Sequence, residues 1–184
     1  KNCFIKKFYP DQMDEQNILE KNGKLFKNKK RLNSLLQADL EGYKVAIFDD
    51  GLQDNSIDYN LRIVCFNNAN WIGNGFTIPS GPLRENVENI KKYKNVFLNG
   101  NDEDLDEIKK FISKIDTNIN IYQGKYIPKN IDEFNTNDKF LVFSGIGNHK
   151  TFISMLKNNK LNIVKDIEFP DHYSYSENDI NEII

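Results

Sequence analysis

Short apolar runs alternate with amphipathic stretches along the chain, and this pattern predicts strands and helices in turn. Runs with β-branched residues predict buried strands at 44–48 and 61–66, further strands at 95–100 and 161–169, and a strand followed by a glycine turn at 140–148. Apolar residues at helical spacing predict helices at 14–21, 27–42 and 102–115, and another through Phe152 and Met155. Strands that alternate with helices indicate an α/β fold with a largely parallel sheet.

Two details of this pattern make specific predictions. In the helix at 27–42, Leu32, Leu35 and Leu36 are expected to form the apolar face. Residues 118–128 alternate in the manner of an exposed strand or ribbon and precede a polar stretch. We therefore place a domain boundary there, with one domain over 1–122 and a smaller one over 123–184.

Composition excludes some classes of protein. The 25 basic and 27 acidic residues give a net charge of −2, so the polybasic signature of a nucleic-acid-binding protein is missing. No apolar run approaches the roughly 18 residues of a membrane-spanning helix. The two cysteines, Cys3 and Cys65, have no metal-ligand spacing and are too sparse for a disulfide scaffold, which suggests a reducing compartment.

Two adjacent carboxylates, Asp49 and Asp50, follow the apolar run VAIF directly. Ligands of open α/β sheets bind beyond the carboxyl ends of the strands, which is where these acids are expected. Four apolar residues followed by an acid also form the Walker B pattern, in which the carboxylate holds Mg²⁺ directly or through water. The alternative is a solvated strand end without a ligand.

The phosphate-binding loop that should accompany a Walker B acid, GxxxxGK[ST], is not found in the sequence. The nearest stretch, GIGNHKT at 145–151, is one residue short and lacks the glycine before the lysine. We interpret it as a strand-to-helix turn, expected away from Asp49 and Asp50.

Two further stretches contain candidate chemistry. Residues 72–85, IGNGFTIPSGPLRE, combine glycines and prolines before Arg84 and Glu85, so the shape of this loop is expected to matter. The alternative is that Arg84 and Glu85 only form an ion pair where a helix begins. In FPDHY, His172 follows an acid at a strand end, and histidine titrates near neutrality, although a single histidine is more often structural.

The motifs DDGLQD, IGNG, PSGPLRE, GIGN and FPDHY occur in the order and spacing of the tetraacyldisaccharide 4′-kinases, the lipid A 4′-kinases, which this sequence resembles across essentially its whole length. The resemblance implies a P-loop-kinase-like core joined by a strand ribbon to a smaller α/β domain. It implies transfer of phosphate from ATP, with Mg²⁺, to the 4′-hydroxyl of a tetraacyl disaccharide 1-phosphate. It also implies a peripheral location at the cytoplasmic face of the bacterial inner membrane.

The P-loop of that family lies upstream of these motifs, and the family continues beyond residue 184. The sequence is therefore expected to be a fragment that lacks both parts and is inactive alone. The P-loop that binds ATP is therefore not expected within these residues.

Residue roles follow from the resemblance position by position. Asp14 matches the catalytic base and Glu15 a Mg²⁺ partner, although Met13 stands where the family usually has glycine and both acids could simply cap a helix. The acids of DDGLQD, with Gln53, match residues near the metal and the acceptor sugar; Leu52 replaces the family's phenylalanine. The other matched positions are Arg84 near the substrate, Glu85 as a metal ligand and His172 as the partner of the base. His149 replaces a proline and inherits no role.

Two further expectations concern residues that should meet in the folded protein. Asp49, Asp50 and Glu85 should converge at one end of the sheet, and Asp14 should meet His172 when substrate is bound.

Two alternatives to a kinase remain at this point: a non-catalytic nucleotide- or sugar-phosphate-binding module, and an α/β sugar hydrolase that uses Asp50 and His172.

Overall fold

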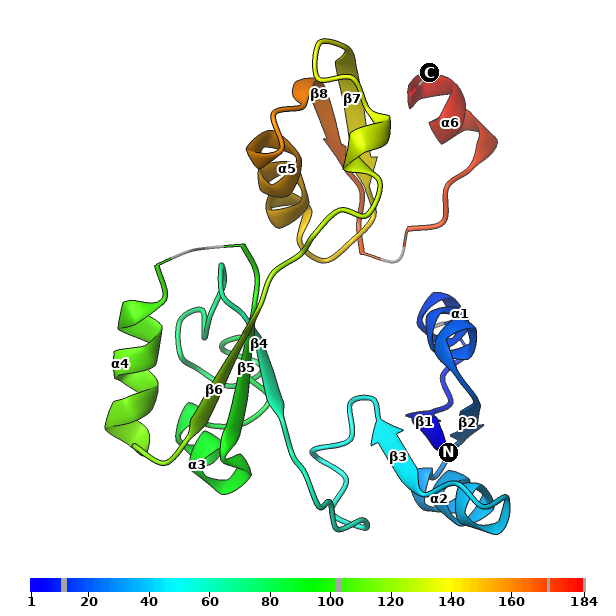
Figure 1. The fold of residues 1–184 in the computed structure, drawn as a ribbon, viewed down its shortest axis with the longest axis vertical. Helices are drawn as coiled ribbons and strands as arrows, with labels where there is room; N and C mark the ends of the chain where they lie inside the picture. The colour runs from blue at the N-terminus through cyan, green and yellow to red at the C-terminus, as the bar shows by residue number, and fades with distance from the viewer. Residues whose placement is uncertain (11–12, 102–103, 172, 184) are drawn as a thin grey trace. The chain divides into compact units, whose positions relative to one another are not determined.

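The computed structural model describes residues 1–10, 13–101, 104–171 and 173–183, which form two compact units, 1–61 and 62–184. Within these described residues the named strands pair in three separate groups, and each pairing between them is parallel (Figure 1). The predicted α/β fold with a largely parallel sheet is confirmed. In the same part of the chain, no helix is both long and apolar enough to cross a membrane.

The first unit is a three-stranded sheet with the strand order β2-β1-β3. Its elements are β1 (Asn2–Lys7), α1 (Met13–Asn22), β2 (Leu25–Asn28), α2 (Arg31–Leu40) and β3 (Val45–Phe48). A core of Cys3, Ile5, Phe26 and Ala38 joins the sheet to α2, with Leu35, Tyr43, Ala46 and Phe48 packed around it. Because each strand is followed by a turn at the same edge, the chain returns three times to the carboxyl edge of this sheet.

Two sequence predictions for the first unit are wrong. Residues 27 and 28, predicted as the start of the helix at 27–42, belong to β2, in which Leu25 and Phe26 pair with β1 and are buried; the helix itself begins at Arg31. The apolar face of α2 is also displaced: Leu32 and Leu36 are 39% and 55% exposed, and the buried positions are Arg31, Ser34 and Ala38. Arg31 faces inward, where it has the hydrogen-bond acceptors described below.

The predicted burial of two strands is wrong as well. In β3, Val45 and Ile47 are 56% and 46% exposed, since the core lies on one face of this sheet and these two side chains point to the other. The strand predicted at 61–66 forms only as β4 (Val64–Asn67), with Cys65 exposed in its middle.

The second unit begins with a sheet of order β4-β5-β6. After β4 come a 3₁₀ turn (Val87–Asn89), α3 (Ile90–Tyr93), β5 (Asn95–Asn99), α4 (Asp106–Ile115) and β6 (Asn120–Gly124). The predicted apolar spacing of α4 is confirmed, because Leu105 and Ile112 are buried against β5 while Ile108 and Ile115 pack beside them. The stretch predicted as a ribbon forms β6, which pairs with β5 at the sheet edge.

The rest of the second unit is a βαβ arrangement. It comprises a 3₁₀ turn (Ile131–Glu133), β7 (Lys139–Ser144), α5 (His149–Asn158), β8 (Asn162–Glu168) and α6 (Glu177–Ile183), with β7 and β8 paired. These elements follow the predictions at 140–148 and 161–169. The predicted domain boundary between residues 122 and 123 falls inside β6, and the division into 1–122 and 123–184 stays a prediction.

Candidate active site

The carboxyl edge of the first sheet gathers charged side chains from four segments of the chain. Lys6 lies near the end of β1, Glu15 in the first turn of α1, and Asp49 directly after β3, while Arg31 opens α2 after β2. Parallel strands bring these segments to one edge although they are separated in sequence. This is the position at which the sequence predicted a site for the carboxylates.

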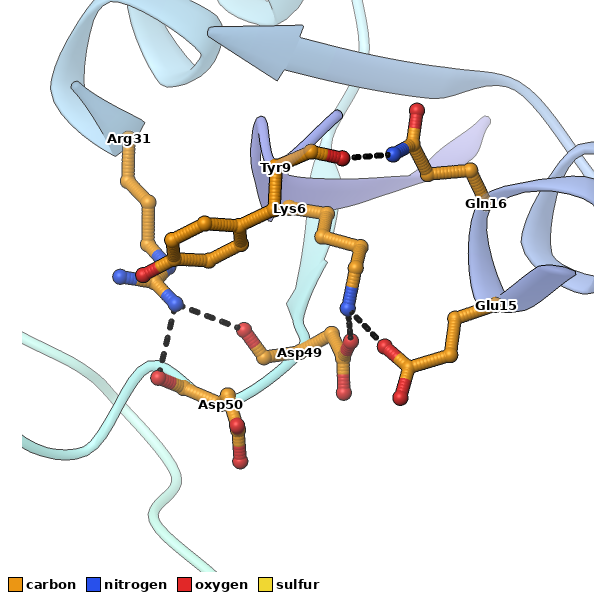
Figure 2. A network of polar contacts seen from close by, with 7 residues as sticks. All are labelled: Lys6, Tyr9, Glu15, Gln16, Arg31, Asp49 and Asp50. Carbon is orange, nitrogen blue, oxygen red and sulfur yellow. Dashed lines mark hydrogen bonds and ion pairs between the residues drawn. The ribbon is translucent and has the colours of Figure 1, made fainter. Parts of the chain in front are cut away.

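Lys6 connects two of the predicted site residues. Its ammonium donates to Glu15 Oε2 through a short contact and to Asp49 Oδ2 at 2.5 Å (Figure 2). The Lys6 side chain is 4% exposed, whereas the side chains of Glu15 and Asp49 are 38% and 42% exposed. The ammonium therefore lies on the protein side of both carboxylates, and the carboxylates face solvent.

The pairing keeps Lys6 charged despite its burial. Burial alone lowers the pKa of the ammonium, but the hydrogen bonds and negative charges of Asp49 and Glu15 more than offset that effect. The pKa of Lys6 is consequently raised above its ordinary value, and the side chain is a cation at neutral pH. A buried cation of this kind is tolerated only where anions pair with it.

Arg31 fixes the backbone of the acidic motif rather than its side chains. Its Nη2 donates to the carbonyl oxygens of Asp49 at 3.2 Å and Asp50 at 2.8 Å, as Figure 2 shows. Nη1 lies 3.8 Å from Asp54 Oδ2. Asp50 has a φ of 53°, a left-handed conformation that aspartate tolerates better than most residues. These bonds hold the turn that aims Asp49 at Lys6.

The remainder of DDGLQD folds back on the strand end. The Tyr59 hydroxyl donates to the carbonyl of Gly51 at 2.8 Å, and its ring meets Phe48 edge-on with centroids 5.0 Å apart. Leu52 is half-buried, while Gln53 and the side chain of Asp50 are exposed. Gln53 and Asp50 are thus accessible to a ligand at this edge.

Asp14 lies beside Glu15 in the first turn of α1 and is exposed. Gln16, the next residue, is fully buried and donates from Nε2 to the carbonyl of Tyr9 at 2.9 Å. That bond ties the start of α1 to the end of the β1 segment, so the orientation of Asp14 and Glu15 is set by a buried neighbour.

In the second unit, Glu85 is held by two neutral donors. Asn89 Nδ2 donates to its carboxylate at 3.0 Å, and the Tyr93 hydroxyl donates at 2.9 Å. The preceding loop is closed by Asn74, whose Nδ2 donates to the carbonyl of Ser80 at 2.8 Å. Gly81 is required there, because a Cβ atom would come within 2.3 Å of the Phe76 carbonyl oxygen. Arg84 is exposed.

The GIGNHKT stretch forms the turn between β7 and α5, in which Asn148 accepts from the amide of Thr151 at 3.0 Å. His149, buried, lies 2.7 Å from Ser144 Oγ through Nδ1 and 3.2 Å from Asp166 Oδ2 through Nε2. It therefore links α5 to both neighbouring strands. A Cβ atom on Gly147 would lie 3.1 Å from Asp171 Oδ2, so this turn packs against the FPDHY segment.

Some predicted encounters stay predictions. Asp14, Asp49 and Asp50 belong to residues 1–61 and Glu85 to residues 62–184, so the convergence of Asp49, Asp50 and Glu85 stays a prediction. The same holds for the separation of GIGNHKT from the acids. His172 lies outside the described residues, so its meeting with Asp14 is also a prediction.

The acids at this edge of the sheet carry the type of donor atom that binds Mg²⁺. Glu15 and Asp49 offer carboxylate oxygens, which Mg²⁺ prefers, and Mg²⁺ is commonly held by one or two carboxylates together with phosphate oxygens and water. Among the residues that the structure describes, no three histidine, cysteine, aspartate or glutamate side chains converge as a metal site.

Sequence reasoning missed Lys6, and with it the link between Glu15 and Asp49. The available signal was a lysine inside the apolar run CFIKKF, where an uncompensated charge would be costly. Arg31, Tyr59 and Tyr93 were missed for a similar reason, since their partners are backbone carbonyls or acids that no local motif identifies.

Known proteins match most of the chain. The family model described as Tetraacyldisaccharide-1-P 4′-kinase matches residues 14–184. A tetraacyldisaccharide 4′-kinase of Pelagibacter ubique is 67% identical over 182 residues, which are 99% of this chain and 58% of that protein. One from Rickettsia bellii is 35% identical over 176 residues, covering 92% of this chain and 51% of the relative.

A solved structure has the same fold. The crystal structure of an "apo" form of LpxK from Aquifex aeolicus in complex with ATP superposes with a TM-score of 0.65 at 21% identity. The match covers 96% of this chain and 64% of that one. The chain spans little more than half of the length of the curated relatives described above.

Proposed function

This chain belongs to the tetraacyldisaccharide-1-P 4′-kinase family, and we propose that it contributes the acceptor-side acids of an enzyme that phosphorylates a lipid A precursor. The reaction transfers the γ-phosphoryl group of ATP to the 4′-hydroxyl of a tetraacyl disaccharide 1-phosphate. The observation that supports it best is the assembly of Glu15 and Asp49 around Lys6 at the carboxyl edge of a parallel sheet.

Asp14 is the proposed general base. It is exposed in the first turn of α1, beside Glu15, where a carboxylate can reach a hydroxyl group of the acceptor. The carboxylate takes the proton of the 4′-hydroxyl as the new O–P bond forms and the bond from phosphorus to the ADP oxygen breaks. His172, from the FPDHY motif, is proposed to orient Asp14 once substrate is bound.

Glu15 and Asp49 are proposed to hold Mg²⁺ that accompanies ATP. When bound, the ion neutralises negative charge on the phosphates. Lys6 already offsets part of the charge of the two carboxylates, so the ion and the phosphates complete a site whose protein charges are arranged in advance. Glu85 is proposed as a further oxygen ligand from the second unit.

Asp50, Gln53 and Arg84 are proposed to contact the acceptor or the phosphates. All three side chains are exposed, and Asp50 and Gln53 belong to the turn that Arg31 and Tyr59 hold in place. Because the acceptor is a lipid, we further propose that the enzyme works at the cytoplasmic face of the inner membrane, bound peripherally.

The test uses the complete protein, purified and incubated with MgATP and tetraacyl disaccharide 1-phosphate in detergent. Mass spectrometry should find a product heavier by one phosphate, and NMR should place that phosphate on the 4′-oxygen. Asp49→Asn should abolish most of the product, while Asn17→Ala, an exposed change on α1, should leave it unchanged. Binding of ATP without any phosphorylated lipid would instead favour a non-catalytic nucleotide-binding module.

A further inference from the structure

Lys6 contacts the two carboxylates from their buried side. The Lys6 side chain is almost fully buried, whereas those of Glu15 and Asp49 remain more than one-third exposed. One nitrogen therefore contacts both acids from the interior, and their solvent-facing sides stay accessible. A surface ion pair has no such asymmetry, because both partners are then solvated.

The arrangement links parts of the chain that no local interaction would connect. Lys6 lies 9 residues from Glu15 and 43 residues from Asp49. Two carboxylates at one place repel each other, and a metal site that relied on the metal alone to assemble them would have to overcome this repulsion at each binding event. A permanent cation behind them removes that requirement.

We propose that Lys6 is a positioning residue for the phosphoryl transfer: its ammonium holds Glu15 and Asp49 together so that their outer sides receive the magnesium ion of MgATP. This inference rests on the proposed function. Lys6 touches neither substrate nor reacting atoms in this account, and acts only through the two carboxylates.

Arg31 does not duplicate this role. Its guanidinium contacts the backbone oxygens of Asp49 and Asp50, so it sets the course of the turn, whereas Lys6 contacts the carboxylates themselves. Loss of Lys6 should therefore change how the protein binds a divalent cation, while the turn retains the Arg31 bonds.

The experiment compares Lys6→Met with Lys27→Met in the complete protein. Lys27 also pairs with a glutamate, Glu20, at 2.9 Å, but both side chains are exposed, so it is a control for the loss of one lysine–glutamate pair in the same unit. Lys6→Arg restores the charge, and Lys6→Gln is a second neutral variant if Lys6→Met does not fold.

Two readouts are measured. In kinase assays, the Mg²⁺ concentration for half-maximal rate should rise about 10–100-fold in Lys6→Met, with a lower kcat, and Lys6→Arg should recover most of the loss. In Mn²⁺ titrations followed by electron paramagnetic resonance, with a non-hydrolysable ATP analogue present, the Kd should rise by a similar factor. Lys27→Met should behave as wild type in both.

Each outcome decides the inference. Wild-type metal dependence and wild-type Mn²⁺ affinity in the neutral Lys6 variants would overturn it. So would a lower kcat with unchanged metal dependence that Lys6→Arg does not recover, because that result would make Lys6 a purely structural residue. If the wild-type protein transfers no phosphate, the proposed function fails, but the Mn²⁺ titration still decides on Lys6.

Discussion

Asp49 and Glu85 are two carboxylates of the predicted site, one in each unit, and they accept hydrogen bonds from different kinds of donor. Asp49, in residues 1–61, receives a hydrogen bond from a buried ammonium 43 residues away in sequence. Glu85, in residues 62–184, receives hydrogen bonds from the amide of Asn89 and the phenol of Tyr93, four and eight residues away. The contact to Asp49 joins distant segments of the folded sheet and is charged on both sides, whereas these two contacts to Glu85 are local and come from neutral donors.

The difference has a thermodynamic consequence. A buried ion pair is costly to break from one side, because the remaining charge stays desolvated without compensation. A carboxylate with neutral donors loses only a hydrogen bond when one donor is removed, and solvent can replace it at a half-buried site. Substitutions near Asp49 should therefore have larger effects than substitutions near Glu85.

The largest stability effect is expected for Arg31→Met. The guanidinium is buried and holds the carbonyls of Asp49 and Asp50, so its loss leaves two backbone acceptors without their donor. We expect the free energy of unfolding to fall by about 2–4 kcal/mol, measured by urea denaturation of the complete protein. Arg31→Lys should fall between this variant and wild type. A loss below about 0.5 kcal/mol for Arg31→Met would contradict the comparison.

A smaller effect is expected for Tyr93→Phe, which removes one neutral donor from Glu85 and leaves the ring. The free energy of unfolding should fall by about 1 kcal/mol, and the change should be insensitive to salt. If Tyr93→Phe proved as costly as Arg31→Met, the expectation that substitutions near Asp49 have the larger effects would not hold.

The same variant has a predicted pH dependence. Burial, followed by the hydrogen bond to Glu85 and its negative charge, raises the pKa of Tyr93 in the folded protein. The stabilisation is therefore fully present below the unfolded-state pKa of about 10 and is lost as the pH rises through the folded-state value. Unfolding curves of wild type and Tyr93→Phe should converge above that range and differ at neutral pH.

The contrast between local and long-range contacts also explains which features the sequence could predict. The strand end at Asp49, the apolar spacing of α4 and the turn between β7 and α5 depend on neighbouring residues, and each was predicted correctly. The apolar pattern did not predict the strand β2, because only Leu25 and Phe26 are apolar in it and its identity comes from pairing with β1. Leu32 and Leu36 were expected on the buried face of α2, but Arg31 is buried there and these two leucines are exposed.

Lys6 shows the limit most clearly. Nothing within a few residues of CFIKKF indicates where the ammonium finds its partners, because Glu15 comes from the following helix and Asp49 follows β3, four elements after β1. Family resemblance did indicate the acids, since motifs preserve residue types in order. It did not indicate the buried cation behind them.

The most direct test of the account concerns the proton of the acceptor hydroxyl. In the complete enzyme, Asp14→Ala should lower kcat by about 10²–10⁴-fold with little change in KM for ATP or the lipid, and His172→Ala should lower it more mildly. Because the two residues are proposed to act as one unit, the double variant should lose much less than the product of the single losses. An unchanged kcat for Asp14→Ala, or fully multiplicative losses in the double variant, would contradict the account.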